Sequence, residues 1–200
     1  MRILKLLVLS VVVFSVAFGA YVSMPKKYKY QISDWYARIG APPFIDAPDL
    51  LEAENQDELI RSLTARKFEL VCTGGLHREE KISELDDHEC HSFINSAYDN
   101  IPASLVSFFF AKRKLTHVRV EFPDTSFNKI NDFLSRKLAN YPRLDQMPNH
   151  RINPDNYGKP LRVWVVKAGI VAMSGEGTPN RDVVLLWSAH DPATLRALRR

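Results

Sequence analysis

The chain has 200 residues, of which 46% are hydrophobic and 25% are charged. This balance excludes a disordered chain, and two cysteines are too few for a small disulfide-rich scaffold. The formal net charge is +4, and Arg2 and Lys5 contribute two of the positive charges in an N-terminal segment without acidic residues. The rest of the chain is nearly neutral, so its composition predicts no nucleic-acid partner.

An uncharged stretch of 19 residues, 6–24, follows this short basic start. A helix of that length crosses a hydrocarbon core of ~30 Å. Residues 1–24 are therefore predicted to form an N-terminal hydrophobic helix, either a cleaved signal peptide or a retained signal anchor that binds the membrane through residues 6–24. Ala17 and Gly19 are small residues of the kind that precede a signal-peptidase cleavage site.

Aromatic and basic residues after the stretch favour retention, because such side chains gather at the membrane–water interface. The candidate membrane-interface residues are Lys26, Lys27, Tyr28, Lys29, Tyr30, Trp35 and Tyr36. The positive charges here outnumber those before the stretch, so the positive-inside bias also permits a cytoplasm-facing anchored domain. We expect export, since a basic start before an apolar run is the usual export pattern. The expected location is the bacterial inner membrane with the domain in the periplasm, or the soluble periplasm after cleavage.

The only two cysteines, Cys72 and Cys90, also bear on the compartment in which the domain lies. In an oxidising compartment they are expected to form one disulfide, whereas in the cytoplasm they would be two free thiols. In the chain-entropy model such a bond would stabilise the fold by about 3 kcal/mol.

Residues 25–54 are predicted to be a tether, because four prolines interrupt any long helix, and residues 55–200 the folded domain. Helical spacing of apolar residues predicts helices at about 56–66 (capped by Asn55), in the second half of 77–99, at about 126–139, and after Asp191. Alternating apolar residues predict strands at 68–72, 105–110, 115–122, 161–167, 169–174 and 183–188. This order indicates an α+β domain, with an antiparallel sheet of five or six strands and two or three helices on one face.

The segment Asp86-Asp87-His88-Glu89-Cys90-His91 is the most site-like cluster. On a helix, His88 and His91 would share a face and, with Asp87, could hold Zn²⁺ or Cu²⁺. The spacing matches no closed zinc pattern, and Cys90 is unavailable if it pairs with Cys72. We therefore favour an acidic, solvated helix start and expect no metal and no cofactor.

The connection 140–160 is longer than usual, and long loops are often functional. Its candidate binding residues are Tyr141, Arg143, His150, Arg151 and Tyr157. The alternative is a crossover stiffened by prolines. Neither a Gly-x-Ser-x-Gly nor a Ser-x-x-Lys motif is present, so no catalytic residue is predicted.

Several segments between Cys72 and Trp187 resemble a type of small exported protein common in proteobacteria. The resembling segments are 97–102, 108–110, 115–123, 126–127, 138–142 and 185–187. The resemblance implies export and an α+β fold, and it implies no catalytic residues. The alternation of helices and hairpins is also similar, in architecture alone, to small accessory modules of outer-membrane assembly machines.

These observations favour a non-enzymatic envelope protein, a membrane-anchored or periplasmic binding or assembly module with a protein partner. One alternative is a metal-dependent or hydrolytic envelope enzyme that uses the His88 and His91 region. The other is the cytoplasm-facing anchored domain, with free thiols.

Overall fold

A computed structural model describes residues 38–148, 150 and 152–191, together with positions 15, 22–25, 36, 194, 195 and 198. The chain divides into two compact units, residues 1–39 and residues 40–200. Most of the first unit, including most of the predicted hydrophobic helix and residues 26–30 and 35 of the predicted membrane-interface set, lies outside the described residues. Tyr36 of that set is described, and its side chain is exposed. Within the described part of the chain, no helix is long and apolar enough to cross a membrane.

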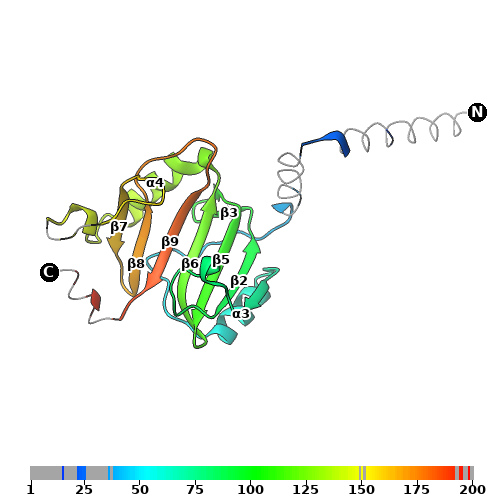
Figure 1. Cartoon of the computed structure of the whole chain (residues 1–200), viewed down its shortest axis with the longest axis horizontal. Helices are drawn as coiled ribbons and strands as arrows, with labels where there is room; N and C mark the ends of the chain where they lie inside the picture. The colour runs from blue at the N-terminus through cyan, green and yellow to red at the C-terminus, as the bar shows by residue number, and fades with distance from the viewer. Residues whose placement is uncertain are drawn as a thin grey trace, which may run out of the picture. The chain divides into compact units, whose positions relative to one another are not determined.

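An antiparallel sheet of seven strands dominates the second unit (Figure 1), in the order β1-β2-β5-β6-β9-β8-β7. Its strands are β1 (Val71–Gly74), β2 (His88–Phe93), β5 (Leu105–Ala111), β6 (Lys114–Phe122), β7 (Leu161–Val165), β8 (Gly169–Ser174) and β9 (Val183–Ala189). A separate two-stranded sheet joins β3 (Ser96–Ala97) to β4 (Ile101–Pro102). The predicted antiparallel α+β architecture is confirmed, with more strands than the five or six expected.

This unit includes the helices α3 (Gln56–Ala65) and α4 (Phe127–Lys137), and short 3-10 turns lie at η1 (Arg78–Glu80), η2 (Asp124–Ser126) and η3 (Leu144–Gln146). Asn55 caps α3 as predicted, since its Oδ1 accepts a hydrogen bond of 3.0 Å from the backbone N–H of Asp57. The apolar stripe expected in α4 is buried at Ile130, Phe133 and Leu134. The helices predicted at about 56–66 and 126–139 are therefore confirmed, whereas most of the helix predicted after Asp191 lies outside the described residues.

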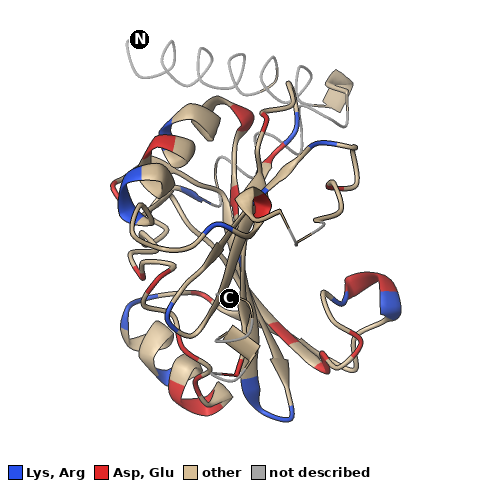
Figure 2. Ribbon diagram, turned by 90° about the vertical axis from the view of Figure 1, so that its left-hand side faces the viewer, with Lys and Arg blue, Asp and Glu red and all other residues tan. Residues whose placement is uncertain are grey.

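Both helices cover the same face of the sheet, which we call the helix face (Figure 2). Cys90, Phe108, Val118 and Trp187 are successive cross-strand partners on that face, and each is no more than 1% exposed. Leucines of α3 and apolar residues of α4 belong to the same buried cluster. Sheet-on-helix packing of this kind supplies the main hydrophobic stabilisation of the domain.

A two-residue turn at Lys112 and Arg113 joins β5 to β6, with φ of 50° and 64°. Positive φ at both turn residues gives a backbone twist that matches the twist of paired strands. The hairpin predicted over 105–122 is confirmed, and so are the three strands predicted between 161 and 188.

The prediction of a helix within 77–99 was wrong. That region contains η1, β2 and β3, and β2 pairs with β1 on one side and β5 on the other. Cys90, Ser92 and Ile94 are buried at alternate positions, which is the period of a strand. The polar residues between them hid this alternation, and pairing with distant strands decided the conformation.

Strand geometry also corrects the proposed sharing of a face by His88 and His91. Residues three apart on a strand lie on opposite faces. Within the described residues, His88 lies on the helix face and His91 on the other, so the two imidazoles do not form one site. Asp87 lies just before β2, where its Oδ2 accepts a hydrogen bond of 2.9 Å from the N–H of Lys112.

Candidate functional site

The sheet face opposite α3 and α4, which we call the open face, holds a row of polar residues across β2, β5 and β6. His91 of β2 pairs with Ser107 of β5, and Ser107 pairs with Arg119 of β6. Glu89 and Glu121 lie two residues away from His91 and Arg119, and so on the same face. Strand pairing therefore brings residues from three separate segments into one polar cluster.

Two contacts organise this cluster, one between a histidine and a carboxylate and one ion pair between an arginine and a carboxylate. Glu89 Oε1 lies 3.8 Å from His91 Nδ1, and Glu121 Oε1 lies 2.7 Å from an Arg119 terminal nitrogen. Both carboxylates are about four-fifths buried, at 21% and 18% side-chain exposure. The Nε of Arg119 is also buried and has no hydrogen-bond partner among the described residues.

Burial raises the pKa of Glu121 above its ordinary value, and the nearby carboxylates of Asp182 and Glu89 act in the same direction. The guanidinium of Arg119 opposes them and lowers the pKa. Glu121 is therefore poised to exchange a proton at a higher pH than an ordinary glutamate.

A groove of about 500 Å³ lies on the open face beside this cluster. Leu186 and Val184 of β9 line it together with Leu161 of β7, and Arg119 lines the end toward β6. Residues 154–157 border the groove, and so does Ile82 from the loop between β1 and β2. The groove therefore combines aliphatic side chains from the sheet with polar side chains at its margins.

Tyr157 lines the groove, and its ring packs against the guanidinium of Arg181. The Arg181 guanidinium is 4.0 Å from the centroid of the Tyr157 ring. Asp155 holds this turn, because its Oδ1 accepts hydrogen bonds from the N–H groups of Tyr157 and Lys159 at 2.9 and 2.8 Å. An aromatic ring and a guanidinium held together in this way offer a recognition surface for polar and aromatic groups.

The loop between β1 and β2 is fixed by Asp86, whose side chain is fully buried. Its carboxylate accepts hydrogen bonds of 2.7 Å from the N–H of Ser83 and from Oγ1 of Thr116. His117 of β6 places Nδ1 3.5 Å from the same carboxylate. Burial lowers the pKa of His117, and Asp86 opposes that shift. Asp86 thus anchors one border of the groove to the sheet.

The predicted binding residues of 140–160 separate in space. Tyr157 lines the groove, but Tyr141 packs against the main core. Arg143 pairs with Asp145 and lies over the Trp164 ring, 5.5 Å from its centroid. His150 is partly buried, with Nδ1 lacking a hydrogen-bond partner in the described part of the chain, and Arg151 lies outside that part. Of the described candidates, Tyr157 alone lines the groove.

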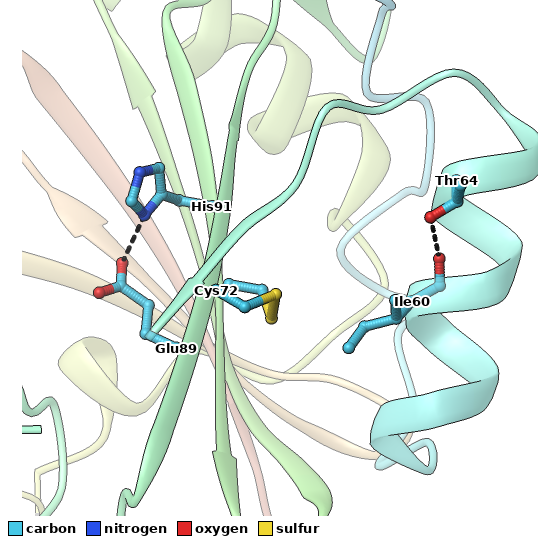
Figure 3. The surroundings of a disulfide bond; sticks show 6 residues. Ile60, Thr64, Cys72, Glu89 and His91 are labelled. Atoms are coloured by element: carbon cyan, nitrogen blue, oxygen red, sulfur yellow. Dashed lines mark hydrogen bonds and ion pairs between the residues drawn. A yellow bond between two sulfur atoms is a disulfide. The ribbon is translucent and has the colours of Figure 1, made fainter. Parts of the chain in front are cut away.

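Cys72 and Cys90 form a disulfide between the paired strands β1 and β2, as predicted for an oxidising compartment. The bond lies on the helix face, beside α3 (Figure 3). Glu89 and His91 project from the opposite side of the same strand (Figure 3). The disulfide and the polar cluster are therefore two separate features of β2.

Sequence reasoning did not identify Ser107, Arg119, Glu121 or Arg181 as site residues. The alternation of His117, Arg119 and Glu121 with apolar residues was visible, and it correctly indicated the polar face of β6. The sequence contains no local signal that β2 and the loop at 154–157 border the same face, since that depends on the strand order.

No protein-family model, curated protein or solved structure matches this chain. The resemblance to small exported proteobacterial proteins therefore stays a prediction.

Proposed function

We propose that this protein is a non-enzymatic binding module of the bacterial cell envelope, and that a partner protein binds in the groove on its open sheet face. The groove of about 500 Å³ is the observation on which the proposal rests. It is bordered by two loops, and one of them is fastened to the sheet by the buried Asp86. A groove with anchored borders needs little reorganisation to accept a ligand.

The composition of the groove favours a protein as the partner. Aliphatic residues at its centre are surrounded by both cations and anions, among them Arg119, Arg181, Asp155 and Asp182. An apolar centre within a polar rim is the usual anatomy of a protein–protein interface. A surface for nucleic acid would instead be dominated by lysine and arginine.

The disulfide supports an envelope location, because such bonds persist in oxidising compartments and are rare in the cytoplasm. The basic start, the apolar stretch 6–24 and the resemblance described above point in the same direction. In this proposal the leader anchors the domain in the inner membrane, or is cleaved to release it into the periplasm. A cytoplasm-facing domain is the alternative, and the thiol state of Cys72 and Cys90 in host cells distinguishes it from an exported domain.

Photo-crosslinking in living host cells tests the proposal. A photoreactive amino acid is placed in the full chain at Leu186, within the groove, and separately at Tyr157, at its margin. The expected result is one light-dependent adduct of the same mass from both positions, recovered in the envelope fraction. Agreement between two positions matters, because a bulky group at Leu186 alone can block the groove.

The matched control is Ser135, which is exposed on α4 on the opposite side of the sheet. It is expected to give no such adduct. Equal adducts from Ser135 and Leu186, or no adduct from either groove position, would contradict binding at the open face.

A further inference from the structure

The helix face holds a second cluster of chemically active side chains, separate from the groove. The two sulfurs of Cys72 and Cys90 and a ring nitrogen of His88 all lie within 4.8 Å of one another. Cys72 and Cys90 are cross-strand partners, and His88 lies two residues before Cys90 on the same face of β2. Among the described residues, this is the one cluster of three such groups close enough to hold a metal ion.

The backbone makes room for the imidazole in this cluster. Gly74 of β1 is the cross-strand partner of His88, and a Cβ at position 74 would lie 3.0 Å from His88 Nδ1. The ring thus occupies space that a side chain on β1 would otherwise fill. On the other side, the ring of Phe110 meets His88 edge-on, with centroids 6.4 Å apart. His88 is therefore held beside the sulfurs by its neighbours on both adjacent strands.

The three groups form the ligand set that zinc prefers once the disulfide is open. Zinc binds two thiolates and one imidazole in a tetrahedral arrangement that leaves the fourth position to water. With Zn–S bonds of 2.3 Å, the two sulfurs would lie about 3.8 Å apart, a separation that rotation of the cysteine side chains can supply. Cys72 is exposed, so reductant and metal can reach the site from solvent.

We propose that the reduced form of this protein binds one zinc ion through Cys72, Cys90 and His88. A dithiol reductant supplies two electrons and two protons to the disulfide, and the reductant itself becomes a disulfide. Each cysteine thiol then releases its proton as its sulfur binds the metal. The disulfide and the zinc ion require the same two sulfurs, so only one of them can be present at a time. Which of the two is present depends on the redox state of the compartment.

Zinc binding to the full chain in mild detergent tests this proposal. The protein is reduced with dithiothreitol, desalted without oxygen and titrated with Zn²⁺ against a chromophoric chelator. The expected stoichiometry is one zinc per reduced chain and none per oxidised chain. Co²⁺ in place of Zn²⁺ should show the sulfur-to-cobalt charge-transfer band and the strong visible bands of a tetrahedral site.

The decisive comparison is between two histidine variants on one strand. His88→Ala should weaken zinc binding by about tenfold or more, since even second-shell changes cost about 10- to 100-fold. His91→Ala, on the opposite face of β2, should bind zinc as the unmodified chain does. Cysteines in an unfolded chain would bind zinc without any dependence on His88.

Equal zinc affinity in the His88→Ala and His91→Ala variants would therefore overturn the proposal. So would a reduced chain that binds no more zinc than the Cys72→Ser, Cys90→Ser double variant. Tryptophan fluorescence, to which the buried Trp164 and Trp187 contribute, reports whether each variant remains folded under the conditions of the titration.

Discussion

The imidazole of His88 lies against the backbone of its cross-strand partner Gly74. A Cβ at position 74 would be 3.0 Å from Nδ1 and 3.3 Å from Cε1 of that ring. Gly74 has an ordinary backbone conformation, so glycine is needed here for space and not for a special φ. Because Gly74 has no side chain, His88 can lie beside Cys72 and Cys90.

Replacing Gly74 by alanine should therefore disturb the zinc site far more than the fold. The ring is the end of a partly exposed side chain and can move outward, so Gly74→Ala should change the free energy of unfolding of the oxidised protein by only about 0.5 kcal/mol. Displacement of the ring should weaken zinc binding by the reduced protein about tenfold. Thr73→Ala, one residue earlier on the opposite face, is the control and should leave zinc affinity unchanged. Unchanged zinc affinity in Gly74→Ala would show that the His88 ring position is not important for binding.

The disulfide joins residues 18 positions apart on an edge strand and its neighbour. Its reduction, with a chelator present to remove zinc, should lower the free energy of unfolding by about 3 kcal/mol, because the unfolded chain regains the freedom of that loop. Urea unfolding followed by tryptophan fluorescence, with and without dithiothreitol, measures the difference. The Cys72→Ser, Cys90→Ser double variant should show no effect of dithiothreitol. A reductant effect of equal size in that variant would locate its cause elsewhere in the chain.

Gly169, at the start of β8, lies against the backbone of β9. A Cβ there would be 2.3 Å from the carbonyl oxygen of Ser188 and 2.7 Å from the indole Nε1 of Trp187. The Ser188 carbonyl oxygen is part of the backbone of a paired strand, so it cannot move without disturbing the sheet. Gly169→Ala should destabilise the protein by about 2–3 kcal/mol in urea unfolding. The neighbouring Lys167→Ala should have a much smaller effect, since it removes only one exposed ion pair with Glu52. Similar values for both variants would contradict the close packing of β8 on β9.

The raised pKa of Glu121 should make stability depend on pH in a defined direction. The folded protein retains a proton on Glu121 at pH values where the unfolded chain, with the ordinary pKa of 4.5, has already lost it. The contribution of this group is therefore complete below pH 4.5 and is lost as the pH rises through the raised pKa. Glu121→Gln should reduce that loss, as measured by urea unfolding at a series of pH values above 4.5.

Glu84→Gln is the matched control for this measurement, since Glu84 is exposed in the loop between β1 and β2. Its pH dependence should equal that of the unmodified protein. If Glu121→Gln and Glu84→Gln give identical curves, then burial of Glu121 does not perturb its protonation.

The elements that were predictable from the sequence are those whose partners lie close in the chain. The β5–β6 hairpin has clean alternation and a short turn, and α4 has an apolar stripe at Ile130, Phe133 and Leu134. β2 was mistaken for part of a helix because Phe93, Ile94, Ala97 and Tyr98 also fit a helical spacing. Its strand conformation depends on pairing with β1 and β5, and no local pattern reports such pairing.

The candidate sites differ in the same way. The disulfide was predictable because the chain has only two cysteines. The association of His88 with those cysteines was not, since it requires the strand register that places His88 opposite Gly74. The groove was still less visible, because Ile82, Arg119 and Tyr157 meet only after three distant segments have folded.

The claim that the domain functions in the oxidising cell envelope is tested most directly by native mass spectrometry of the protein from its own host. Cells are lysed without reductant and with free thiols blocked by an alkylating agent. We predict a mass lighter by two hydrogens than the reduced chain, without alkylation and without bound zinc. The same mass shows whether the leader is retained or cleaved after Ala17 or Gly19. A full-length chain with both thiols alkylated, or one carrying zinc in place of the disulfide, would place the domain in a reducing compartment and contradict the envelope assignment.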